Sequence, residues 1–190
     1  AITIDAQGRV TAASTNAFSA GVTSDAQGNT VAGTNAGDSF TGTDAENNAL
    51  FGKDAGTAIT TGDKNTAVGA NALSANTTGT LSVAVGFDAL KNSTGGLATA
   101  VGTFAADAHT TGAYTTAIGY SALGAVTTGQ ANTGVGHQAG ASVTTNSNNT
   151  AVGYNALVNS TGSSNTAVGS QSLDANTTAS NNTAVGKAAL

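Results

Sequence analysis

Apolar residues return along the chain with a fixed spacing, as a Val-Gly, Ile-Gly or Phe-Gly pair that recurs every 16 or 17 residues. The unit is clearest at 149–157, where it reads Asn-Thr-Ala-Val-Gly-Tyr-Asn-Ala-Leu. A constant period of this length is typical of repeat proteins, in which each repeat is one unit that stacks on its neighbours. The glycines of the pair are Gly52, Gly69, Gly86, Gly102, Gly119, Gly136, Gly153, Gly169 and Gly186.

The three residues before each glycine, typically Thr-Ala-Val, predict a short β-strand because β-branched residues favour strands. We expect the residue next to the glycine to point into the coil, and the leucine four residues after the glycine to be a second inward position. The predicted inward core is therefore Val68, Val85, Val101, Ile118, Val135, Val152, Val168, Val185, Leu73, Leu90, Leu123, Leu157 and Leu173.

A pair of threonines marks a corner in each repeat, as at Thr110-Thr111. In the two shorter repeats the pair reads Ser93-Thr94 and Ser160-Thr161, which places the lost residue between the leucine position and the pair. Each coil is predicted to hold two short strands and two corners. We predict an all-β fold, a parallel β-roll or β-solenoid of about nine coils over residues 47–190, roughly 40 Å long at the ~4.8 Å strand spacing. The density of glycine and threonine argues against helices.

Residues 1–46 are less regular and predict a β lead-in or capping segment. The stretches 2–5 and 9–12 alternate as strands around Ala6-Gln7-Gly8, which indicates a hairpin. The segment 29–37 is a degenerate copy of the later unit and predicts a capping coil. Because the repeat stops at Leu190 without a cap, we expect the native chain to continue beyond this residue.

The predicted core is thin for a single chain. Each coil offers mainly one valine and one leucine, worth roughly 1.5–3 kcal/mol each when buried, whereas ordering each residue costs on the order of 1–2 kcal/mol. We therefore predict an obligate homo-oligomer, in which the alanine before each valine allows close approach between chains. The alternative is a monomeric solenoid whose small residues pack within the chain.

Composition and charge narrow the possible functions. The net charge is −5 and the five basic residues are scattered, which argues against nucleic acid as a partner. No apolar run approaches the ~18 residues of a membrane span, so we expect no membrane insertion. Neither His109 nor His137 has metal-ligand neighbours at a suitable spacing, and we interpret His109 and the nearby Asp107 as part of a solvated corner. We predict no enzyme, no metal and no cofactor.

The position directly after the glycine varies most and is predicted to face outward. It carries Phe87, Tyr120, His137 and Tyr154, which are predicted to form a ladder of rings along the array. Such a ladder is a candidate contact for a host glycan or receptor. The alternative is that these rings cover surface made of small residues or pack between chains.

The Asn-Thr-Ala-Val-Gly-x-x-Ala-Leu unit resembles the repeat arrays of phage tail fibre proteins, and is similar to the head repeats of trimeric autotransporter adhesins. This resemblance implies a left-handed homotrimeric β-roll that serves as a structural and adhesive segment of a virion tail fibre, supports host-surface attachment and contacts other fibre proteins. A bacterial surface adhesin, located at the cell surface, is the alternative. An ice-binding solenoid is a further alternative, disfavoured because the paired threonines are adjacent and lie in corners.

Overall fold

The computed structural model describes residues 2–4, 10–13, 22–41 and 44–190 of the chain. Within these ranges the chain contains strands and turns and no helix. Strands β1 (Ile2–Ile4) and β2 (Val10–Ala13) pair in antiparallel fashion, as the predicted hairpin requires. Its predicted turn, Ala6-Gln7-Gly8, lies outside the described residues.

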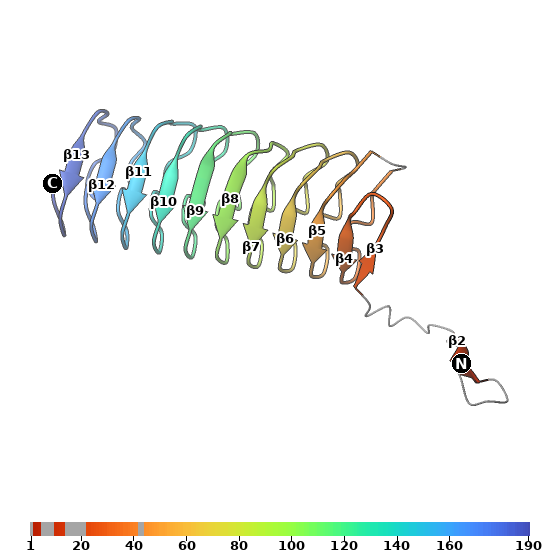
Figure 1. Ribbon diagram of the computed structural model, residues 1–190. Coiled ribbons are helices and arrows are strands. Elements are labelled where there is room, and N and C mark those ends of the chain that lie inside the picture. The colour runs from red at the N-terminus through yellow and green to blue at the C-terminus, as the bar shows by residue number, and fades with distance from the viewer. Residues whose placement is uncertain (1, 5–9, 14–21, 42–43) are drawn as a thin grey trace.

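The remaining strands form one continuous sheet in sequence order, and the chain is a β-solenoid of about nine turns (Figure 1). Every pairing from β4 onward is parallel, whereas β3 runs antiparallel to β4 at the N-terminal end of the stack. The strands are β3 (Thr23–Ser24), β4 (Thr30–Ala32), β5 (Ala49–Phe51), β6 (Thr66–Val68), β7 (Val83–Val85), β8 (Ala98–Val101), β9 (Thr115–Ile118), β10 (Thr133–Val135), β11 (Thr150–Val152), β12 (Thr166–Val168) and β13 (Thr183–Val185).

Equivalent residues of successive coils lie side by side in the sheet. Thr133 pairs with Thr150 and Val135 with Val152, and the same register holds along the stack. The degenerate copy at 29–37 joins this sheet through β4, which pairs with β5 in parallel. The period in the sequence therefore corresponds to one turn of the solenoid.

Each coil contains one strand, so the prediction of two strands per coil is wrong. After the repeated glycine the backbone enters the left-handed region at the second and fourth positions, as at Asn155 (φ 54°) and Leu157 (φ 52°). These dihedral angles cannot belong to an extended strand. The turns of successive coils are nevertheless hydrogen-bonded to one another, as where the Leu157 N–H donates to the Ser172 carbonyl at 3.0 Å.

The residue before each repeated glycine was predicted to point into the coil, and this prediction is wrong. The residue before each glycine points out of the coil: Val68, Val101, Ile118 and Val168 are 36–40% exposed. The other predicted members of this column lie outside the core as well, with Val85, Val135 and Val152 half-buried and Val185 exposed.

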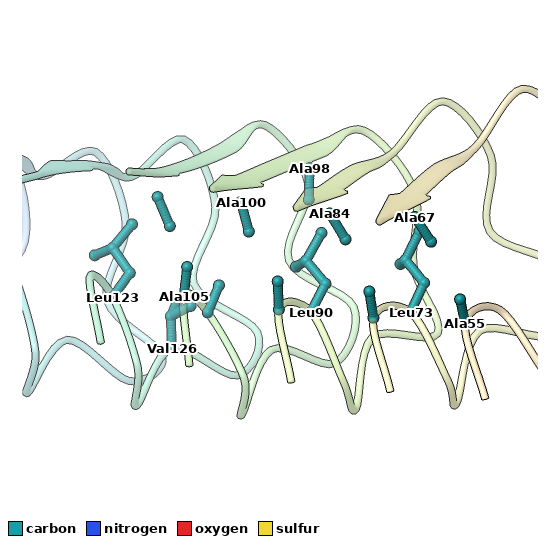
Figure 2. Close-up of a cluster of buried hydrophobic side chains, with 14 of the residues drawn as sticks. Ala55, Ala67, Leu73, Ala84, Leu90, Ala98, Ala100, Ala105, Leu123 and Val126 are labelled. Atoms are coloured by element: carbon teal, nitrogen blue, oxygen red, sulfur yellow. The ribbon is translucent and has the colours of Figure 1, made fainter. Parts of the chain in front are cut away.

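The alanine column fills the interior instead, together with the predicted leucines Leu73, Leu90, Leu123, Leu157 and Leu173, which are all buried. In Figure 2, Ala67 and Ala84 point from the strands toward Leu73 and Leu90 on the turn layer below. Because each leucine already spans much of the gap between the two layers, the strand position opposite it has room only for a methyl group. Volume, rather than apolar character, therefore selects the inward residue.

Coils without the buried leucine compensate within the same turn. Gly56 and Gly140 occupy the leucine position, and three residues later these coils carry buried Ile59 and Val143. A Cβ at Gly56 would lie 2.8 Å from both the Ile59 Cδ1 and the Leu50 Cδ1 atoms, so these two side chains occupy the space that a side chain would need. The same position also carries buried Val126 in the coil of Leu123, so this second apolar position is not restricted to coils that lack the leucine.

A ladder of buried asparagines precedes the strands, and its role was not predicted from the sequence. The Asn149 side-chain amide donates to the Gly162 carbonyl at 3.0 Å, which closes its own coil. Its Oδ1 atom accepts the backbone N–H of Asn165 at 3.0 Å, which joins the next coil. The same arrangement recurs at Asn48, Asn65 and Asn165.

The corner that absorbs the deletions is also placed differently from the prediction. The Thr94 N–H donates to the Thr110 carbonyl at 2.9 Å, just as Thr60 bonds to Thr77. Thr94 is therefore the first threonine of its pair, and the residue that is missing is the second. The prediction that the deletion precedes the pair is wrong.

Candidate functional site

A ladder of aromatic rings runs along the outside of the solenoid, where the chain leaves the strands. Phe87, Tyr120 and Tyr154 are 45%, 47% and 52% exposed, and His137 is exposed as well. The ring centroids of Tyr120 and His137 lie 5.3 Å apart, and those of His137 and Tyr154 lie 5.2 Å apart. The coil spacing sets these distances, because successive coils are hydrogen-bonded neighbours in one sheet.

The structure adds Phe104, which the sequence analysis missed. The coil between Phe87 and Tyr120 carries Thr103 at the variable position, and Phe104 follows it with φ 56°. Its ring makes edge contacts with Phe87 at 5.6 Å and with Tyr120 at 6.0 Å. Phe104 therefore makes the ladder continuous over five coils, and the aromatic residue one place late in the repeat was its only sequence signal.

The orientation of the rings decides what they offer to a ligand. The planes of Tyr120, His137 and Tyr154 are within 18° of parallel, so the inner ring faces cover one another. Their edges, which carry the phenol hydroxyls and the imidazole nitrogens, are the parts available for hydrogen bonds. Each ring pair also contributes about 0.5–1.5 kcal/mol to the stack.

His109 lies inside the solenoid, so its interpretation as part of a solvated corner is wrong. Its side chain is fully buried, and the Nε2 atom is hydrogen-bonded to the carbonyl of Gly112. Because a carbonyl only accepts, Nε2 carries a proton, and Nδ1 lies 3.0 Å from the Ser93 hydroxyl, which also contacts the Gly95 carbonyl at 3.2 Å. Burial lowers the pKa of His109, and the bond to Gly112 partly opposes this shift.

This histidine takes the place of a ladder asparagine. Its coil begins with Ala98, which has no amide to close the turn, and His109 supplies the missing donor to Gly112. Ser82 and Thr115 begin the neighbouring coils, and their buried hydroxyls have no hydrogen-bond partner among the described residues. We find a structural role for His109 and no chemical one.

A second exposed feature is the outward face of the sheet. The strands β6 to β13 present threonine and valine in two parallel columns, here called the Thr/Val face, with Val83 and Ile118 as the exceptions. None of these strands contains a charged residue. At its edge Leu81, Leu97 and Tyr114 are 54%, 41% and 65% exposed, where other coils carry Lys64 or Asn148. Exposed apolar side chains that gather on one face mark candidate interaction sites in soluble proteins.

The charged side chains form small, separate contacts. Lys91 lies 3.0 Å from Asp88, and Lys53 lies 3.4 Å from Asp54. Burial raises the pKa of the Asp107 carboxyl, and Asp88 acts in the same direction. In the ranges that the structure describes, no three His, Asp or Glu residues gather as metal ligands would, and no helix is long and apolar enough to cross a membrane.

No protein-family model, curated protein or solved structure matches the chain. The ring ladder and the Thr/Val face therefore stand as candidate sites on their geometry alone. The first offers a row of polar ring edges, and the second offers a flat, uncharged surface along the full stack.

Proposed function

We propose that this chain is a structural segment of a trimeric, non-catalytic phage tail fibre that supports host-surface attachment. The observation that carries the proposal is the Thr/Val face, which continues without a charge from β6 to β13. A rod of stacked coils with one uncharged side is suited to lateral association with identical rods. The repeat unit, which resembles tail fibre arrays, supports the same assignment.

The alanine column cannot form the contact between chains, because Ala67, Ala84 and Ala151 are buried within the coil. In the proposed trimer the Thr/Val face forms the contact between chains. Its side chains repeat at the ~4.8 Å strand spacing, so identical columns from three chains can interdigitate in matching register. Because the face carries no charge, the contact brings no like charges together directly, although each chain has a net charge of −5.

Native mass spectrometry and light scattering test the assembly. Three copies of the 18.0 kDa chain give a species of about 54 kDa. The double variant Val135→Asp/Val152→Asp places two carboxylates on the face and is expected to release the 18.0 kDa chain. Asn159→Asp, an exposed corner substitution, is the matched control and should leave the mass unchanged. A wild-type chain that is monomeric at micromolar concentration would exclude the trimer.

The role in attachment needs its own measurement. A soluble fibre protein is expected to compete with phage for host cells, so pre-incubation of cells with the chain should lower the adsorption rate of the phage that carries it. The bacterial surface adhesin is the alternative, and a full-length chain with membrane-anchor strands or a signal sequence would favour it. Unchanged adsorption with a folded trimer would restrict the segment to a purely structural role.

One observation favours contact with ice as a second candidate function. The strand threonines, such as Thr99, Thr116 and Thr133, lie in register on the outward face. The corner threonines are less suitable, because hydroxyls such as that of Thr110 donate to the carbonyl of the next coil, here at 3.1 Å. Thermal hysteresis of the purified chain would support this function, and its absence would remove it.

A further inference from the structure

The ring ladder ends abruptly at Tyr154. The next two residues of the same column are Ser170 and Lys187, and no further ring pair follows Tyr154 among the described residues. One face of Tyr154 is stacked on His137, whereas the other face is turned toward the coil of Ser170, whose side chain is too short to cover it. The column therefore contains a step between Tyr154, which has an open aromatic face, and the small residue Ser170.

Hydrogen-bonding side chains line this step. The column beside the rings carries Ser121, Gln138, Asn155 and Gln171, which are uncharged and can both donate and accept. In the N-terminal half the same column carries Asp54 and Asp88, which are occupied by Lys53 and Lys91. Asn71 adds one amide to the N-terminal half of this column, but it donates to Asp88 at 2.7 Å. The uncharged polar lining is therefore continuous from Ser121 to Gln171.

One of these side chains lacks a partner. The Asn155 Oδ1 atom is buried and accepts no hydrogen bond among the described residues, although it lies next to Tyr154 in the chain. Buried acceptors of this kind are rare in folded proteins, because leaving one unpaired costs free energy. Because the atom is shielded from solvent, a hydroxyl bound at the step supplies the missing donor once the Asn155 amide turns outward.

We propose that this step, formed by Tyr154, Ser170 and the adjacent amides, binds a polysaccharide that lies along the solenoid axis. One sugar ring stacks its apolar face on the open face of Tyr154, above Ser170. Gln138, Asn155 and Gln171 bind the hydroxyls of this sugar and its neighbours, and the ring edges of Tyr120 and His137 extend the contact. The inference rests on the proposed role in attachment, and it names the ligand class of that site.

Binding is measured on an array of immobilised dextran, mannan, β-glucan and alginate, with the full chain as probe. We expect retention on at least one of these polymers. Tyr154→Ala is expected to weaken this binding roughly three- to tenfold, the size of one lost aromatic contact. Asn159→Ala removes an exposed polar side chain from a corner of the same coil, outside both the ring ladder and the Thr/Val face, and is the control.

Ser170→Tyr separates binding from stability. The new ring covers the open face of Tyr154 and continues the stack, so the variant should lose binding while its melting temperature stays the same or rises. No retention on any of the four polymers, or unchanged binding in Ser170→Tyr, would overturn the proposal. If Tyr154→Ala dissociates the assembly, the rings lie between chains and the proposal is wrong. A trimer that binds no polymer refutes only this inference, whereas a monomer that binds refutes only the fibre assembly.

Discussion

Removing one amide from the asparagine ladder is expected to destabilise the solenoid more than any exposed polar substitution. In Asn149→Ala, the Gly162 carbonyl loses the amide donor at 3.0 Å, and the Asn165 backbone N–H loses its acceptor at 3.0 Å. Asn149 is 1% exposed, so water cannot replace either partner. Each buried group left unpaired costs about 1–3 kcal/mol, which gives a total loss of roughly 2–6 kcal/mol in the free energy of unfolding.

Urea denaturation followed by circular dichroism measures this loss, and hydrogen exchange locates it. Exchange of the backbone amides should accelerate first at the coils on both sides of Asn149, because each repeat contacts only its neighbours. Asn159→Ala is the matched control: its amide donates to the Asp174 carbonyl at 2.8 Å, but at an exposed corner. The control is expected to change stability by less than about 0.5 kcal/mol. Equal losses in the two variants would show that the ladder contributes no more than a surface hydrogen bond, and the reasoning would fail.

Two further predictions concern the glycines and the buried histidine. Gly153→Ala should lower the free energy of unfolding by several kcal/mol, because its Cβ would lie 2.6 Å from the Gly169 carbonyl carbon and its φ is 133°. Gly186→Ala is the control, since it has the same backbone strain (φ 129°) without that overlap. Similar melting temperatures of the two variants would contradict this prediction. Because the pKa of His109 is lowered in the folded chain, the unfolded chain takes up a proton at a higher pH than the folded chain does. The free energy of unfolding should therefore be constant above pH ~6.5 and decrease below it, by at most about 1.4 kcal/mol per pH unit. In Ala98→Asn/His109→Val, which restores the amide and removes the imidazole, this decline should disappear from pH-dependent urea titrations; its persistence would assign it to another group. Asp107, whose pKa is raised, acts with the opposite sign at lower pH, so the comparison uses the onset of the decline just below pH ~6.5.

The repeat and its register were predictable, because stacking places equal residues above one another and therefore repeats the same constraints in every coil. The glycine at φ 133° illustrates this: a Cβ on Gly153 would meet the backbone of the next coil, so only glycine fits there. The leucine column was predictable for a similar reason, because a large apolar residue recurred at one position. The outward ring column was recognisable from its variability.

The direction of the strand residues was not predictable from apolar character. In a Thr-Ala-Val strand either the alanine or the two β-branched residues face inward, and hydrophobicity favours the valine. The structure buries Ala151 and exposes part of Val152, because Leu157 already occupies the gap opposite the strand. The position of Phe104 in the ladder and of His109 in the core was equally hidden, since each compensates for a residue missing from its own coil.

The sequence by itself determined the architecture: a parallel stack of short coils, its period, its register and the residues that allow each turn. Only the tertiary structure decided which side of each strand is the inside, since that depends on the distance between the strand layer and the turn layer. The role of the asparagines also depends on the tertiary structure. The side chain of Asn149 is hydrogen-bonded to the Gly162 carbonyl at the far end of its own coil and to the Asn165 backbone N–H in the next coil. The surface left outside, the Thr/Val face and the open ring of Tyr154, is where the function of this chain is to be tested.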